Sequence, residues 1–148
     1  MVDSDYKLVW RLTLNEGLAV PERVFGFRTV RGNLGEVLAD RGLASLGDAY
    51  VNFVYSLALS NRTRKPKGVK VKGGVLAEAL RRAGLREYLG SGMTRHGLAD
   101  AAEALLVYGW MNRSVTLDEC AAALGKSEDA VDGFSVLLKT VKNRVTFP

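Results

Sequence analysis

Two acidic residues, Asp100 and Glu103, interrupt a stretch that is otherwise free of charge, residues 98–111. In an α-helix, residues three apart lie on one face, so both carboxylates would share an apolar stripe with Ala104 and Val107. A helix that is apolar on every side is normally buried. Two unpaired carboxylates would be costly there unless a cation met them. That cation could be an arginine, a lysine or a metal ion.

A third acid, Asp48, is the only charged residue in a second long apolar stretch, residues 43–60. Two buried helices of this kind should pack against each other or against a common neighbour, which would bring three carboxylates within reach of one site. Carboxylate oxygens suit Mg²⁺ or Mn²⁺. Such ions serve phosphoryl chemistry, because they activate water and stabilise the leaving oxygen.

The same acids also allow a reading without a metal ion. Asp48 could cap a helix, and Asp100 and Glu103 could be acids of a first helical turn that the helix dipole favours. Arg95 or a nearby lysine would then pair with them. Both readings stay open on the residues alone.

A basic segment spans residues 62–72 and contains no acid. Its cations are Arg62, Arg64, Lys65, Lys67, Lys70 and Lys72. These six cations exceed the net charge of the whole chain, which is +5. So concentrated a patch is typical of a surface that binds a nucleic-acid backbone, although a solvated loop without a partner is the alternative. Pro66 and Gly68 predict that the segment is a loop that could reach over a substrate.

The elements that would position these residues are predicted to be helices. We expect an all-α fold of about seven helices in a single domain over residues 1–148. Seven helices are expected, over residues 21–32, 34–42, 43–60, 74–83, 98–111, 117–125 and 128–143. Residues 6–14 alternate like a strand, but we favour a helix there because one isolated strand would have no partner. Asn33, Thr116 and Ser127 are the expected N-caps, and Gly42, Gly84 and Gly125 the expected ends.

The rest of the composition excludes several classes of protein. Cys120 and His96 are the only cysteine and the only histidine, which excludes a disulfide framework and a structural zinc site within one chain. A metal would therefore be held by oxygen ligands. No apolar run reaches the roughly 18 residues of a membrane span, and the N-terminus lacks the basic start of a secretory signal, so we expect a cytoplasmic protein without a membrane partner. Cys120 is expected to be a buried small residue. His96 is expected to be a surface or capping residue, with substrate contact as the alternative.

Three motifs resemble the ribonuclease III family. Leu46-Gly-Asp-Ala49, at the head of an apolar helix, resembles the family signature. Residues 98–105 resemble its second acidic motif, and residues 73–89 resemble the helix that links the two. The similarity covers about residues 33–112. It implies the endonuclease-domain bundle and the hydrolysis of phosphodiester bonds in double-stranded or structured RNA, with a metal cofactor, to 5′-phosphate ends.

The resemblance also implies roles for individual residues. Asp48, Asp100 and Glu103 match the carboxylates that bind Mg²⁺ or Mn²⁺. Asp48 and Glu103 are the implied catalytic residues, and Glu103 is the direct ligand on which the chemistry most depends. The usual glutamate four residues before the signature aspartate is Ala44, and the aromatic residue after it is Ser45. We therefore expect one metal ion or slower cleavage.

Two smaller groups resemble this chain more specifically. The Mini ribonuclease III branch similarly has a small residue at the glutamate position and no separate double-stranded RNA-binding domain. An archaeal ribonuclease III-like group of short all-helical proteins is also similar. By this resemblance the protein should form a homodimer, with the Asp48 helix near the two-fold axis. The six cations would then clamp the duplex, which proteins recognise mainly through its shape, phosphates and 2′-hydroxyls.

Two other functions remain as alternatives. The first is a non-catalytic RNA-binding or scaffold protein on the same fold, because Ala44 removes one carboxylate. The second is a helix-turn-helix DNA-binding protein, because residues 116–131 form a capped helix, a glycine turn and the start of a second helix. However, Glu128, Asp129 and Asp132 would place three acids where DNA lies, and these would repel it.

Overall fold

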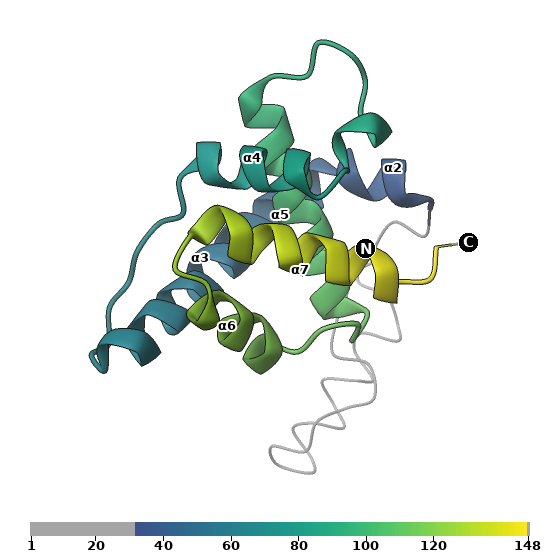
Figure 1. Ribbon diagram of the computed structural model, residues 1–148. Coiled ribbons are helices and arrows are strands. Elements are labelled where there is room, and N and C mark those ends of the chain that lie inside the picture. The colour runs from purple at the N-terminus through teal and green to yellow at the C-terminus, as the bar shows by residue number, and fades with distance from the viewer. Residues whose placement is uncertain (1–31, 148) are drawn as a thin grey trace, which may run out of the picture.

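Six α-helices and one short 3₁₀ helix make up residues 32–147, the part of the chain that the computed structural model describes (Figure 1). They are α2 (Leu34–Leu38), α3 (Arg41–Thr63), α4 (Gly73–Arg82), η1 (Arg86–Tyr88), α5 (Arg95–Met111), α6 (Leu117–Lys126) and α7 (Ala130–Arg144). No β-strand occurs in this range, so the predicted all-α fold is confirmed. The helices expected over residues 6–14 and 21–32 lie outside it. The single domain over residues 1–148 therefore stays a prediction.

Helix α5 is the centre of the bundle. It packs against α2, α3, α4 and α7, and it lies behind α4 and α7 in the view of Figure 1. Every residue from 101 to 109 is buried, as expected for a helix that is apolar on all sides. Within residues 32–147, no helix combines the length and the apolar character needed to cross a bilayer.

Two glycines let helices approach α5 closely. A Cβ atom on Gly47 of α3 would overlap the backbone carbonyl of Glu103, and one on Gly109 would overlap the side chain of Val141 on α7. Side chains larger than hydrogen would push these helices apart. The crossing at Gly47 consequently brings the next residue, Asp48, beside Glu103.

Several predicted helix ends are confirmed. The Asn33 side chain accepts a hydrogen bond from the Glu36 amide at 3.0 Å, so it caps α2. Thr116 and Glu119 form the predicted capping box at the start of α6. Gly84 follows α4 with a φ of 75°, a conformation that glycine adopts without strain.

Other predicted ends are wrong, each because an aspartate begins a helix. Helix α2 ends at Leu38 and Gly42 lies inside α3, because the Asp40 carboxylate accepts a hydrogen bond from the Leu43 amide and begins a new helix at once. Ser127 is not the cap of α7. Asp129 has that role, accepting from the Val131 amide at 2.9 Å.

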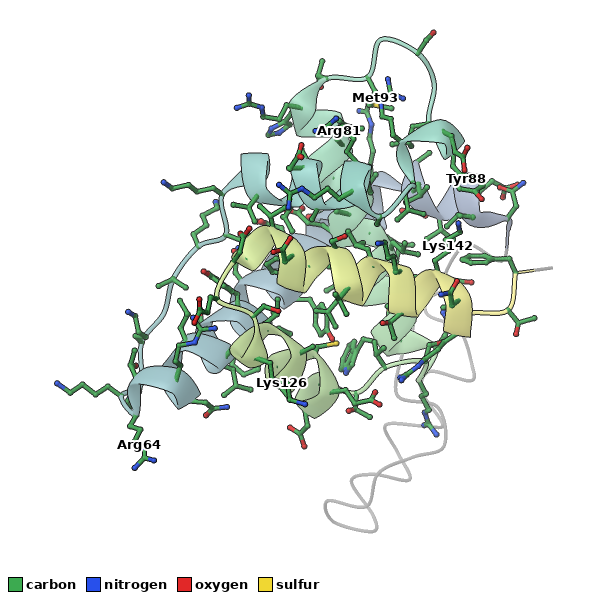
Figure 2. The ribbon with its side chains drawn as sticks, viewed as in Figure 1. Arg64, Arg81, Tyr88, Met93, Lys126 and Lys142 are labelled. Carbon is green, nitrogen blue, oxygen red and sulfur yellow. The ribbon has the colours of Figure 1, made fainter. Side chains whose placement is uncertain are left out.

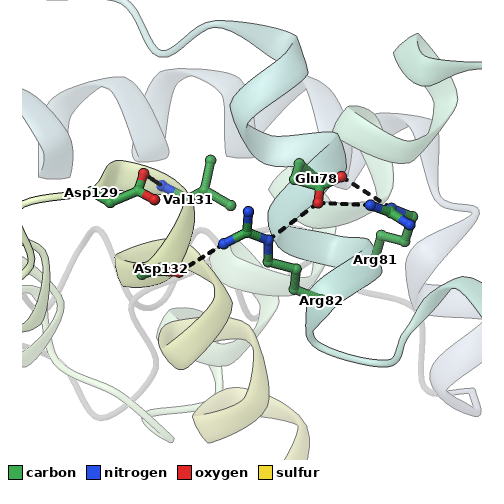
Figure 3. A network of polar contacts seen from close by, with 6 residues as sticks. All are labelled: Glu78, Arg81, Arg82, Asp129, Val131 and Asp132. Carbon is green, nitrogen blue, oxygen red and sulfur yellow. Dashed lines mark hydrogen bonds and ion pairs between the residues drawn. The ribbon is translucent and has the colours of Figure 1, made fainter.

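A surface network joins α4 to α7 (Figure 3). Glu78 accepts hydrogen bonds from Arg81 and Arg82, and Arg82 also donates to Asp132 of α7 at 2.8 Å. Exposed ion pairs of this kind contribute little to stability. Asp132 is thus engaged with α4, and the opposite side of α7 enters the core through Phe134.

Candidate functional site

An open cavity of about 800 Å³ lies between α3, α5 and the segment that follows α3. Its ionisable lining residues are Arg41, Asp48, Lys70, His96, Asp100 and Glu103. All three acids predicted as site residues therefore line one cavity, although they come from two helices. This is the first condition for their acting together.

The two helices position the acids through their crossing. Asp48 follows Gly47, where the backbones of α3 and α5 are in contact. On α5, residues 96, 100 and 103 are four and three apart, so His96, Asp100 and Glu103 follow one face of that helix. The cavity is therefore acidic along α5, with His96 at its outer, exposed end.

Glu103 is the most perturbed acid of the site. The residue is 8% exposed, and its pKa is raised to about 7, with burial as the largest cause. The neighbouring charges of Asp48 and Asp100 and a hydrogen bond with Asp48 contribute to this rise, whereas Lys70 opposes it. Near neutral pH, Glu103 is thus divided between its protonated and ionised forms.

The three acids have no arginine or lysine partner at ion-pair distance within residues 32–147. The pairing with Arg95 that the sequence allowed does not form there. Lys70 acts on Glu103 through its charge, without an ion pair. The electrostatic cost of gathering these carboxylates is therefore not offset by a direct cationic contact from this part of the chain.

The three acids are ligands of the type that a divalent cation prefers, but their side chains are not arranged around a common point. Carboxylate oxygens are the ligands that Mg²⁺ and Mn²⁺ prefer, and a cation would relieve the repulsion around Glu103. In the described part of the chain, however, no three His, Cys, Asp or Glu side chains are gathered closely enough to hold an ion as they stand. To bind one, Asp48, Asp100 and Glu103 would have to turn toward a common point.

Ala44 and Ser45 line the same cavity. Ala44 is buried, one helical turn before Asp48 on α3. The position that resembles the site of a fourth carboxylate therefore faces the acids but offers no oxygen ligand.

Asn52, which the sequence pattern did not single out, contacts an acid of the site. Its Nδ2 donates to Asp48 Oδ1 at 3.3 Å, and its Oδ1 accepts from the Val71 amide at 2.7 Å. The signal that could have found it is its spacing. Asn52 lies four residues after Asp48, one turn along the same face of a helix with few polar side chains.

The basic segment is confirmed as a loop over most of its length, but its first two residues complete α3. From Arg64, at the far end of α3, the chain runs back toward α4 (Figures 1 and 2). Lys70 lines the cavity, whereas Arg64 lies well away from Met93 of the cavity wall. The six cations thus extend along a path that reaches the acids at Lys70.

Arg62 has a structural partner. Its guanidinium donates to the carbonyls of Leu124, Gly125 and Ser127, at 3.1, 3.1 and 2.7 Å. It therefore satisfies carbonyl groups at the C-terminal end of α6 and fixes the end of α3 against that helix. The other predicted cations, Arg64, Lys65, Lys67, Lys70 and Lys72, are exposed.

Cys120 is buried, as predicted, and it accepts a hydrogen bond from the Tyr50 hydroxyl at 3.4 Å. Burial raises the pKa of both groups. Neither side chain lines the cavity, so this pair packs α3 against α6.

No curated protein matches this chain. The family model for Ribonuclease III matches residues 41–145, a range that contains both acidic helices and the basic segment between α3 and α4. The three acids in one cavity and this match over most of the chain lead to one conclusion: the chain belongs to the ribonuclease III family.

Proposed function

We propose that this protein is a metal-dependent endoribonuclease that hydrolyses phosphodiester bonds in double-stranded or structured RNA to 5′-phosphate ends. Family membership supports a ribonuclease-type function. The observation that carries the finer proposal is the convergence of Asp48, Asp100 and Glu103 on one open cavity beside Lys70. A cavity that is both acidic and open suits a phosphodiester held through a cation.

The acids of the cavity would have separate roles. Asp48, Asp100 and Glu103 would hold Mg²⁺ or Mn²⁺, which when bound neutralises phosphate oxygens and lowers the pKa of water. Without a cation the pKa of Glu103 is about 7, and a bound cation would keep this carboxylate ionised near neutral pH. Asp48 would fix Glu103 through their shared hydrogen bond. Because Ala44 supplies no oxygen, we propose a single metal ion.

RNA would be bound along the basic segment. Duplex RNA is recognised mainly through phosphates and 2′-hydroxyls, which a row of lysines can contact without reading sequence. Lys70 would hold the phosphate nearest the acids, and Lys65, Lys67, Lys72 and Arg64 its neighbours. Arg62 would stay on α6, because its guanidinium already satisfies three carbonyls.

A homodimer would use the exposed apolar face of α3. Leu46 and Phe53 are 39% and 57% exposed, and their seven-residue spacing puts them on one side of the helix. Exposed apolar side chains gathered on one face are typical of an interaction surface.

One alternative keeps the fold without catalysis. Ala44 and the absence of a preassembled metal cluster within residues 32–147 favour an RNA-binding or scaffold protein. The DNA-binding alternative has no such support. Glu128 and Asp129, at the start of α7, would repel a DNA backbone.

The test is a cleavage assay on end-labelled duplex RNA. With Mg²⁺ or Mn²⁺ we expect cutting to 5′-phosphate ends, which EDTA stops. Asp48→Asn should abolish cutting but leave RNA binding intact. Asp118→Asn, which removes an exposed carboxylate on α6, should cut like the wild type. RNA binding without cutting at any metal concentration would instead establish the non-catalytic alternative.

A further inference from the structure

The basic segment is bound to α3 by a ladder of side chain to backbone hydrogen bonds. Polar side chains four residues apart on the helix meet backbone groups two residues apart on the segment. The pairs are Asn52 with Val71, Ser56 with Val69, and Ser60 with Lys67. Each serine hydroxyl both donates to the carbonyl and accepts from the amide of its partner, at 2.9 to 3.1 Å.

The two spacings match physically. Four helical residues rise about 6 Å, and two extended residues span about 6.6 Å. The register of the segment is therefore fixed along the helix. Because successive residues of an extended chain face opposite sides, Val71 is buried while Lys70 and Lys72 are exposed. The ladder thus decides which cation reaches the cavity.

The first of these three pairs differs from the others, because Asn52 also contacts an acid of the site. The Val71 amide can only donate, so it must meet the oxygen of the Asn52 side chain. The amide nitrogen of Asn52 then necessarily faces Asp48 Oδ1, which accepts from it. One side chain consequently holds both Asp48 and the backbone next to Lys70.

We propose that Asn52 is a positioning residue that couples the orientation of Asp48 to the docking of the basic segment on α3. When the segment is docked, the Val71 amide fixes the Asn52 side chain, which directs its own N–H toward Asp48. Ser56 and Ser60 hold the segment without touching any acid of the cavity. The catalytic consequence of this coupling rests on the proposed function, whereas the coupling itself does not.

Two variants of Asn52 and one of Ser56 distinguish the hydrogen bond to Asp48 from the hydrogen bonds that hold the basic segment. Asn52→Asp keeps the acceptor for Val71 but replaces the donor to Asp48 with a carboxylate oxygen that repels it, with almost no change in shape. Asn52→Ala removes both bonds. Ser56→Ala removes the next pair of the ladder and leaves Asp48 untouched. Thr140→Ala, which deletes a hydroxyl bonded to the Val136 carbonyl on α7, controls for the loss of a surface hydrogen bond.

The coupling is measured first without activity, by amide hydrogen exchange and by the NMR resonance of the Asp48 carboxyl carbon. Asn52→Ala should speed exchange at Val71 about tenfold and shift the Asp48 resonance. Asn52→Asp should shift that resonance with little change at Val71. Ser56→Ala should speed exchange at Val69 and leave the Asp48 resonance in place, because the Val71 amide still holds Asn52. An equal response of Asp48 to Asn52→Ala and Ser56→Ala, or no response to either, would overturn the proposal.

Kinetics on duplex RNA give the second measurement. We expect kcat to fall about tenfold in both Asn52 variants, and Ser56→Ala to raise KM without changing kcat. An unchanged or higher kcat in Asn52→Asp would contradict the positioning role. If the wild type cuts no RNA, the proposed function fails while the exchange and NMR results still decide whether Asn52 couples the two groups.

Discussion

At the scale of single residues, Glu103 is where burial and charge oppose each other most directly. It is the only acid, base or amide among the buried residues of the described chain, and two further carboxylates line the same cavity. If the protein is a metal-dependent ribonuclease, this unfavourable grouping of carboxylates serves cation binding. Under the proposed function, a site that is costly when empty of cations would bind one well.

Glu103→Gln should therefore stabilise the protein, in a way that depends on pH. The pKa of Glu103 rises from 4.5 to about 7 on folding, so between these values the folded state keeps a proton that the unfolded state has lost. Stability consequently falls as pH rises through this window, and the full cost is present above pH 7. Relative to its effect near pH 4, Glu103→Gln should raise the free energy of unfolding near pH 8 by up to about 3 kcal/mol.

Urea unfolding in EDTA at the two pH values measures this difference. Glu87→Gln, which changes an exposed glutamate of η1, should give the same small effect at both. A Glu103→Gln effect that does not depend on pH would contradict the assigned cost of ionising Glu103.

The three acids could be predicted from the sequence because each is the rare charge of an apolar helix. The contributions of Asn52, Lys70 and Arg62 could not. The reach of Lys70 into the cavity depends on how the segment docks on α3. Arg62 is engaged by carbonyls at the end of α6 that lie 62 residues or more further along the chain. Local patterns do not contain contacts made over such separations.

At the scale of elements, the crossing of α3 and α5 sets the geometry of the site. Gly47→Ala should force the two helices apart, because its new methyl group would overlap the Glu103 carbonyl. We expect a loss of about 1–3 kcal/mol in the free energy of unfolding, together with slower cleavage. Gly125→Ala on α6 is the matched control, because its methyl group would meet nothing within 4 Å.

Chemical denaturation of Gly47→Ala and Gly125→Ala measures the free energy of unfolding of each variant. The control should be neutral or slightly stabilised, since alanine favours helix over glycine. Equal stability of the two variants would show that α3 and α5 do not meet closely at Gly47.

Helix centres could be predicted better than helix ends. Apolar runs correctly identified α3 and α5, because burial decides whether such runs form helices. The ends depend on which of several neighbouring polar residues caps the helix. Asp40 and Asp129 are the N-caps of α3 and α7, because their carboxylates accept hydrogen bonds from free amides of the first turn. The helix boundaries therefore differ from those that Gly42 and Ser127 suggested.

At the scale of the whole molecule, the proposed dimer rests on the apolar face of α3. Phe53→Glu should convert a dimer into monomers, because a charge cannot be buried there without a partner. Val136→Glu changes an equally exposed apolar residue, 54% against 57%, on α7, and should leave the dimer intact. Sedimentation measures the masses. Dissociation by both variants, or by neither, would contradict this interface.

The fold class could be predicted from the sequence because long apolar helices leave few ways to bury their faces, and the family match agrees with it. The partner surface could not be predicted in the same way. Phe53 resembles a core residue in the sequence, and only the packing of α3 on α5 and α6 leaves it exposed.

The central proposal is that Glu103 holds a cation on which RNA cleavage depends. Its most direct test is the rate at which Glu103→Gln cuts duplex RNA in Mn²⁺, compared with the wild type. The substitution keeps the size of the side chain and removes the charge that would hold the cation. The claim predicts that cleavage is lost, with RNA binding and the folded state intact. Cleavage by Glu103→Gln at the wild-type rate would contradict it.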